Sequence, residues 1–186
     1  TQFFSYYFVV DLNGYWLSFP TNENLVGNRI FEENLWWLEE VKTGQKTVFL
    51  KVIKGKILEY VTGFATPLRN NNGEIVAVLR GVQLISENNI YKRTFDQISN
   101  DKNIFAYLVS SDGKLISHSN MAIEKSFNAE IDYITKPPVQ ELLKGISGKI
   151  VYEDNGIKYH ANFKRFSICN WGIVIGEPIK EIYSEI

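Results

Sequence analysis

The sequence predicts an α+β protein made of two similar units in tandem, each with an antiparallel sheet of about five strands flanked by helices. Short apolar runs alternate with Asn-Gly and Asp-Gly turns, which are typical of β-hairpins. The order hairpin, helix, three strands occurs twice. Matching residues of the two copies stand 99 positions apart, as in the pairs Gly14 and Gly113, Ser18 and Ser117, and Gly73 and Gly172. A recurrence of this kind indicates a duplicated structural unit.

The first unit is expected to begin with a hairpin around Asn13-Gly14 and to continue with a helix that ends at Gly44. Two further hairpins follow, with turns at Lys54-Gly55 and at residues 70–73. The expected strands are residues 3–10, 15–19, 47–53, 56–66 and 74–84, and the expected helix is residues 28–43.

The second unit repeats this order with a hairpin around Asp112-Gly113 and a turn at residues 154–156. The expected strands are residues 105–109, 114–117, 148–153, 157–166 and 171–177, with a short helix at 139–144. A polar, periodic stretch joins the units, in which Ile90, Phe95 and Ile98 form one apolar helix face. The tail from Pro178 is expected to begin another helix. These boundaries divide the chain into a first unit at 1–85, a connecting helix at 86–103 and a second unit at 104–186.

The composition favours a globular protein and excludes several functions. Of the 186 residues, 45% are hydrophobic and 22% are charged, which is enough for a core. The net charge of −1 argues against a nucleic-acid partner. The single cysteine, Cys169, excludes an intrachain disulfide and a cysteine-based zinc site. No apolar stretch approaches the roughly 18 residues of a membrane span. The chain begins inside an apolar run at Thr1, so we expect it to be part of a longer protein.

The order of several blocks resembles the double Cache (dCache_1) domain. FVVDLNG at 8–14, ATPL at 65–68 and NGEIVAVL at 72–79 resemble its membrane-distal half. AYLVSSDGKLISH at 106–118 and NWGIVI at 170–175 resemble its membrane-proximal half. The resemblance covers nearly the whole chain and implies two PAS-like units. In that family a long helix precedes the first strand, and this helix is missing here, so we expect the biological domain to begin before Thr1.

The resemblance implies a sensor rather than an enzyme. Double Cache domains lie outside the cytoplasm, on the extracellular or periplasmic side, between two membrane helices of histidine kinases, chemoreceptors or diguanylate cyclases. We therefore expect a small-molecule ligand in the distal unit, flanking membrane anchors, a homodimer formed alongside the missing helix, and no cofactor or metal. Any catalytic output would belong to a cytoplasmic domain outside this chain.

The resemblance places the ligand between the distal sheet and the helix region around residues 29–37. Trp36-Trp37 stands eight residues before Gly44, close to the spacing of the aromatic pair in amino-acid-binding members. Adjacent helical residues point about 100° apart, so one ring can pack on the sheet while the other faces a pocket. The alternative is that both rings pack on the sheet. Arg29 is expected at the start of the helix, where the dipole favours an anion.

The amino-acid signature of the family is not met. Its arginine two residues before the aromatic pair corresponds to Asn34, and its late-strand aspartate corresponds to Val82. An ammonium group over Val82 would lack a charged partner. Arg80 shares a strand face with Val82, because alternate residues of a strand point the same way. We therefore predict a small carboxylate, held by arginine at a site with the candidate residues Arg29, Trp36, Trp37, Tyr60, Arg80 and Val82.

Other functions have weaker support in the sequence. His118 and His160 are the only histidines, and His118 ends a strand where the family often has histidine, so we interpret it as structural. No Ser-His-Asp order, metal-ligand cluster or phosphate loop stands out. Three alternatives remain open: a non-binding structural or dimerisation module of a receptor, a free small-molecule carrier, and a hydrolase. The identity of the ligand and the type of output domain stay undetermined.

Overall fold

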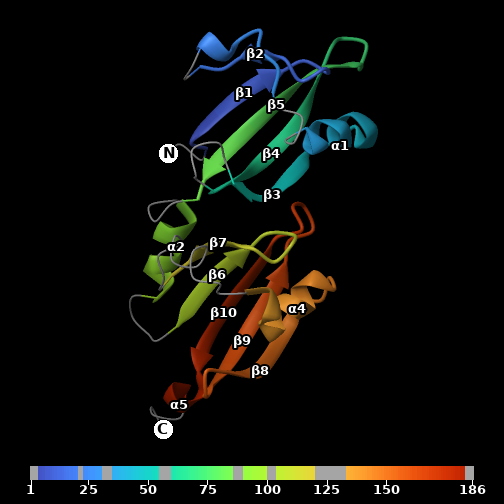
Figure 1. The fold of residues 1–186 in the computed structure, drawn as a ribbon. Coiled ribbons are helices and arrows are strands. Elements are labelled where there is room, and N and C mark those ends of the chain that lie inside the picture. Colours follow the sequence, from blue (N-terminus) through green and yellow to red (C-terminus); the bar gives the residue numbers. More distant parts are fainter. Residues whose placement is uncertain are drawn as a thin grey trace. The chain divides into compact units, whose positions relative to one another are not determined.

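The computed structural model describes residues 4–20, 23–30, 35–54, 60–85, 90–99, 104–119 and 133–182. The chain divides into two compact units, Thr1–Leu84 (unit 1) and Ile85–Ile186 (unit 2). Each unit contains one five-stranded antiparallel sheet, and the strand orders are β2-β1-β5-β4-β3 and β7-β6-β10-β9-β8 (Figure 1). The two orders are the same when each unit is counted from its own first strand. This confirms the predicted α+β fold of two tandem PAS-like units.

Unit 1 follows the predicted order of hairpin, helix and three strands. Its described elements are β1 (Tyr6–Val10), β2 (Trp16–Ser18), a 3-10 turn η1 (Glu23–Leu25), α1 (Trp36–Gly44), β3 (Val48–Lys54), β4 (Tyr60–Arg69) and β5 (Ile75–Leu84). β5 is the central strand and pairs with β1 on one side and β4 on the other. Figure 1 shows α1 on one face of this sheet.

Unit 2 repeats this arrangement. Its described elements are α2 (Ile90–Ser99), β6 (Phe105–Val109), β7 (Leu115–His118), a 3-10 turn η3 (Tyr133–Thr135), α4 (Pro137–Leu143), β8 (Gly148–Asp154), β9 (Ile157–Arg165), β10 (Gly172–Pro178) and α5 (Ile179–Ile182). The central strand β10 pairs with β6 and β9. Pro178 is the last residue of β10 rather than the first turn of a helix, so α5 begins one residue later than predicted.

The hairpin turns form because polar side chains bind the backbone of the turn. In the first turn of unit 1, Asp11 Oδ1 accepts hydrogen bonds from the backbone N–H of Asn13 at 2.9 Å and of Tyr15 at 2.8 Å. Gly14 completes the turn with a φ of 85°, a conformation that favours glycine. These contacts are local, which explains why turn residues predict the hairpins.

The predicted start of helix α1 at residue 28 is wrong. Residues 28–30 are extended along the β1–β2 hairpin: Asn28 accepts a hydrogen bond from the N–H of Trp16 at 2.9 Å, and the N–H of Ile30 donates to Gly14 at 2.8 Å. An isolated bridge also joins Tyr15 to Arg29. Because these backbone groups are bound to the hairpin, they cannot form helix bonds. The helix ends at Gly44 as predicted, but Gln45 takes the left-handed conformation with a φ of 50°.

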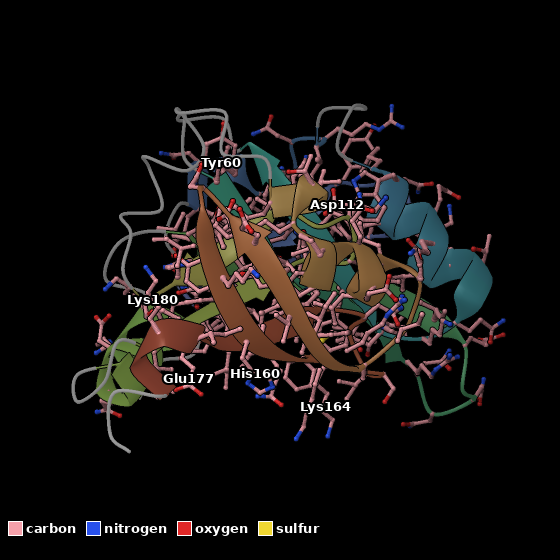
Figure 2. All side chains as sticks on the ribbon, turned by 90° about the horizontal axis from the view of Figure 1, so that it is seen from below. Tyr60, Asp112, His160, Lys164, Glu177 and Lys180 are labelled. Atoms are coloured by element: carbon pink, nitrogen blue, oxygen red, sulfur yellow. The ribbon has the colours of Figure 1, made fainter. Side chains whose placement is uncertain are left out.

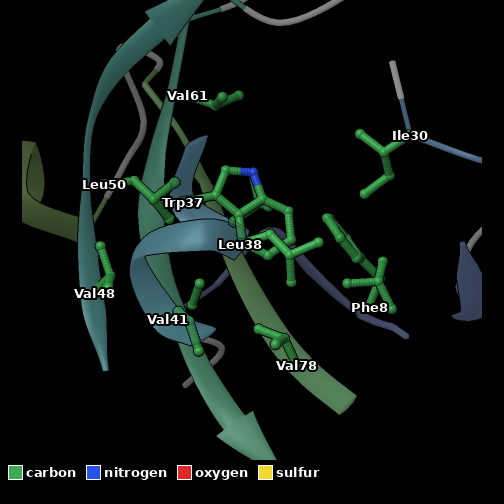
Figure 3. Packing of buried hydrophobic residues seen from close by; sticks show 12 residues of the cluster. Phe8, Ile30, Trp37, Leu38, Val41, Val48, Leu50, Val61 and Val78 are labelled. Carbon is green, nitrogen blue, oxygen red and sulfur yellow. The ribbon is translucent and has the colours of Figure 1, made fainter. Parts of the chain in front are cut away.

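The core of unit 1 lies between α1 and the facing side of the sheet (Figure 3). Trp37 occupies its middle and is fully buried, with Leu38 and Val41 from the same helix beside it. The sheet contributes Phe8, Val10, Val48, Leu50, Val61, Ala65, Val78 and Val82. Register places these sheet residues on one face, since residues directly opposite each other in neighbouring strands point the same way.

The sheet of unit 2 has two different faces. α4 covers one of them, over a core of aromatic and aliphatic side chains that includes Tyr107, Tyr133 and Phe163. On the other face α2 packs against β6 and β7. His160, Lys164 and Glu177 project together from this second face, away from α4 (Figure 2).

Some predicted features lie wholly or partly outside the described residues. These are residue 3 of the first strand, residues 31–34 of the first helix, Gly55 and residues 56–59 of the second hairpin, the segments 86–89 and 100–103 at the ends of the connecting helix, and residues 183–186 of the tail. The side chains of Ile90 and Ile98 also lie outside the described part. The helix α2 accounts for the described middle of the connecting segment, and Phe95 on it is buried as expected.

Candidate functional site

Arg80 lies on the core face of the central strand β5 and is only 6% exposed. It pairs with Phe8 of β1 and with Ala65 of β4, both buried. Its guanidinium carbon is 5.0 Å from the centre of the Trp37 ring and 5.6 Å from the centre of the Phe8 ring. Among the described residues Arg80 has no hydrogen-bond acceptor and no ion-pair partner, and its Nε is completely buried. Within the described residues the cation is therefore held by the two aromatic rings.

Trp37 supplies a second unsatisfied donor beside Arg80. Its indole Nε1–H is buried and has no acceptor within the described part of the chain. A buried donor without a partner costs about 1–3 kcal/mol, so two in one place are unusual in a native core. The neighbouring Trp36 is 37% exposed and does not belong to this core. The two rings thus point in different directions, as the helical spacing predicts.

The described surroundings of Arg80 contain no buried acidic side chain. In the described part of unit 1 the buried polar side chains are Thr62, Arg80 and Gln83, and none of them is acidic. Thr62 and Gln83 pair with each other on the opposite face of the sheet. Burial lowers the pKa of Arg80 from 12.5 to about 10, with a smaller opposing effect of Tyr6. Arg80 is still charged at neutral pH, and the described residues of this core supply no acid to neutralise it.

The structure brings only some of the predicted site residues together. Val82 lies two residues beyond Arg80 on the same face and is 2% exposed, so the predicted shared face is confirmed. Tyr60 alternates with Val61 on β4 and therefore points to the opposite face of the sheet. Arg29 is exposed, on the far side of the β1–β2 hairpin from β5, and its Nε donates to the carbonyl of Asn13 at 3.2 Å. Asn34 lies outside the described residues.

A separate groove of about 450 Å³ lies at the end of α1, lined by side chains that include Lys42, Arg69 and Glu74. Its cations already have partners. Arg69 donates to the carbonyls of Gln45 at 2.8 Å and Gly73 at 2.6 Å, and Lys42 is 2.8 Å from Glu39. Neither Arg80 nor Trp37 lines it. Because its charges are satisfied and largely exposed, this groove is a weaker candidate than the core around Arg80.

The aromatic core of unit 2 contains polar groups that the sequence patterns do not place in a candidate site. Tyr107 is 1% exposed, yet its hydroxyl has no hydrogen-bond partner among the described residues. The ring of His118 stacks on Tyr107 at 5.6 Å. Burial, followed by the charges of Lys136 and Lys92, lowers the pKa of His118 from 6.5 to about 4. One signal in the sequence points to this place: Tyr107 stands 99 positions after Phe8, so a hydroxyl replaces a hydrogen at a repeated core position.

Within the described ranges, three or more side chains of the kind that bind metals do not come together anywhere. The described helices are also too short or too polar to cross a membrane.

Comparison with protein families identifies the chain. The model of the double Cache family (dCache_1, Cache domain) matches residues 1–186. The chain belongs to the double Cache family. This confirms the resemblance of the sequence blocks and the expected class of function, a ligand-sensing domain. No curated protein matches this Cache domain.

Solved structures share the fold of this Cache domain. An extracellular ligand-binding receptor from Desulfohalobium retbaense is 10% identical, with a TM-score of 0.69 over 95% of this chain. The ligand-binding domain of a Pseudomonas fluorescens chemoreceptor, in complex with L-isoleucine, is 15% identical with a TM-score of 0.64 over 98% of this chain. That of a Pseudomonas aeruginosa amino-acid chemoreceptor, in complex with L-Arg, is 18% identical with a TM-score of 0.62 over 98%.

The Cache domain spans 30% of the Desulfohalobium protein and 72% and 75% of the two chemoreceptor domains. At these identities the likeness shows the fold alone.

Proposed function

We propose that unit 1 binds a small carboxylate at Arg80 and Trp37, with Phe8 and Val82 as apolar walls. The observation that carries the proposal is a pair of buried donors that have no acceptor among the described residues, with 5.0 Å between the guanidinium carbon and the indole centre. A carboxylate has two oxygens that accept hydrogen bonds, so one anion can satisfy both donors and neutralise the buried charge.

The same surroundings disfavour an ordinary α-amino acid as ligand. An ammonium group entering with the carboxylate would need an acid, and no acidic side chain is buried in the described part of unit 1. Leaving that ammonium unpaired in an apolar core is costly. A simple acid without an amino group, such as propionate, therefore fits the site better.

A second function has one observation in its favour. Trp37 is fully buried among side chains of its own unit, as expected of a distal unit that only spaces or dimerises a receptor. Such a unit would take up no ligand, so a binding experiment separates the two functions.

The test is a calorimetric titration of the 186-residue chain with propionate. We expect binding by the wild type and a loss of affinity of about 30-fold or more in Arg80→Gln, because a buried ion pair loses one partner. Arg29→Gln is the matched control, since it removes an exposed arginine of the same unit, and its affinity should equal that of the wild type. Equal affinities in all three proteins, or no binding by the wild type, would contradict the proposal.

We further propose that the domain stands outside the cytoplasm between two membrane anchors of a dimeric receptor whose catalytic or chemotactic output lies in another part of the protein. Family membership and the receptor origin of the similar structures support this arrangement. Ligand binding in unit 1 would then shift an equilibrium between two states, by no more than its difference in affinity for them.

A further inference from the structure

The aromatic core of unit 2 has the features of a second binding site, distinct from the one proposed in unit 1. Tyr107 projects from β6 on the α4 face of the sheet, and its buried hydroxyl lacks a partner in the described part of the chain. In a close-packed interior such a group normally finds an acceptor. Within the described residues the Tyr107 hydroxyl is therefore a donor that is left for a molecule that enters the core.

Aromatic rings surround the side chain of Tyr107. The Tyr133 ring meets the Tyr107 ring edge-on, with 5.1 Å between the ring centres. The His118 ring stacks parallel to the Tyr107 ring, with 5.6 Å between the ring centres. Phe105 stacks at 5.9 Å and in turn contacts Tyr159 at 5.4 Å. The sheet beneath them carries small residues, since Ala161 pairs directly with Gly176 on the same face, and the Phe105 ring lies over Gly176. Rings standing around small residues form the kind of apolar wall that binding sites use.

A pair of opposite charges lies at the same core. Lys136, just before α4, and Asp154, at the end of β8, are 2.5 Å apart and only partly exposed, with side-chain exposures of 18% and 34%. The Lys136 ammonium also lies 5.4 Å from the centre of the Tyr133 ring. Burial raises the pKa of Tyr107 most, followed by the phenols of Tyr152 and Tyr133 and then by the carboxylate of Asp154.

We infer that unit 2 binds a small zwitterion, whose carboxylate accepts from Tyr107 and faces Lys136 while its ammonium faces Asp154 and the tyrosine rings. A partly exposed ion pair contributes little to stability, so exchanging it for two charge-assisted contacts with a ligand is not prohibitive. Neither charge of the ligand is left without a partner. This distinguishes the site from unit 1, whose described core holds a cation but no acid.

The duplicated fold places this site over the same strands as the site proposed in unit 1. Phe8 and Tyr107 stand 99 positions apart, and each pairs with a core residue of the central strand, Arg80 in unit 1 and Val174 in unit 2. In unit 1 the buried donor comes from the central strand, and in unit 2 it comes from the neighbouring strand. One scaffold thus offers two different polar groups at matching places.

The test compares L-alanine with its two halves, propionate and ethylamine, by calorimetry on the 186-residue chain. We expect L-alanine to bind and its affinity to fall about tenfold in Tyr107→Phe, which removes only the unpaired hydroxyl. Asp154→Asn should weaken L-alanine at least as much. Tyr7→Phe is the matched control, because Tyr7 is 55% exposed on unit 1, and it should leave the affinity unchanged.

Arg80→Gln separates this site from the one in unit 1. L-Alanine binding that persists in Arg80→Gln and is weakened about tenfold in Tyr107→Phe supports the second site, whether or not propionate binds to unit 1. The inference is overturned if the wild type does not bind L-alanine, if Tyr107→Phe binds it normally, or if propionate or ethylamine alone binds in a Tyr107-dependent way. The folding of each variant is checked by its unfolding midpoint, and Tyr107→Phe should be at least as stable as the wild type, because no hydrogen bond is lost.

Discussion

Replacing Arg80 by methionine should stabilise the ligand-free protein while abolishing carboxylate binding. Methionine retains the apolar stem that packs between Phe8 and Trp37 but removes the buried charge. Burial lowers the pKa of Arg80 from 12.5 to about 10. At 1.36 kcal/mol per pH unit, the buried cation costs about 3 kcal/mol at neutral pH. Its contacts with two rings offset roughly 1–2 kcal/mol of this, so the net gain of Arg80→Met is about 1–2 kcal/mol.

The lowered pKa of Arg80 means that its burial in the charged form reduces the free energy of unfolding. The folded protein releases the Arg80 proton at a lower pH than the unfolded chain does, so the burial penalty is fully present below about pH 10. Urea unfolding at pH 7 measures the gain, with and without propionate. Propionate at 100 times its dissociation constant should raise the unfolding free energy of the wild type by about 2.7 kcal/mol. It should not raise that of Arg80→Met. A variant that is less stable than the ligand-free wild type by 1 kcal/mol or more would show that Arg80 is already satisfied, and would refute the reasoning.

Two further predictions concern stability. His118 has a pKa of about 4 in the folded protein against 6.5 in the unfolded chain. The stability it contributes is therefore present above pH 6.5 and is lost as the pH falls towards 4, by up to about 3 kcal/mol. Urea unfolding between pH 7 and 4 should show a smaller loss of stability in His118→Phe than in the wild type, and an equal pH dependence of the two would contradict this. Gly63 has a φ of 152° and lies against the carbonyl of Gly81, so Gly63→Ala should lower the unfolding free energy by about 2 kcal/mol or more. Gly44→Ala, where an added methyl meets only the flexible Lys46 side chain, should be neutral or slightly stabilising, and equal losses in both glycine variants would argue against strain at Gly63.

The strands and hairpins were predictable because their determinants are local. Asp11 and Gly14 fix the first turn through contacts within four residues, and Asn70 accepts hydrogen bonds from the N–H groups of Asn72 and Glu74 in the same way. The start of α1 was not predictable in this way. Residues 28–30 are helix-compatible in isolation, but their backbone groups bind Gly14 and Trp16, which are distant in sequence. Non-local pairing of this kind overrides local propensity.

In the candidate site, too, the features set by local sequence were predictable and those set by non-local packing were not. The shared face of Arg80 and Val82 follows from strand alternation alone, and the structure confirms it. The position of Tyr60 depends on the pairing of β4 with β5, and that register turns its side chain to the other face. The burial of Trp37 rather than Trp36 depends on where the helix begins. That Arg80 has no acceptor among the described residues depends on every element around it, which no pattern in the sequence encodes.

A buried cation without a partner is a disadvantage for folding, and in a sensor this disadvantage sets the size of the response. A state that closes around Arg80 carries the burial penalty of about 3 kcal/mol until an anion enters. A ligand that removes this penalty in one state and not in another shifts the equilibrium by up to about 150-fold, at 1.4 kcal/mol per factor of ten. This lies at the upper end of the couplings typical of allosteric proteins. A core already neutralised by its own acid would be more stable without ligand, but it would leave the ligand no such difference to exploit.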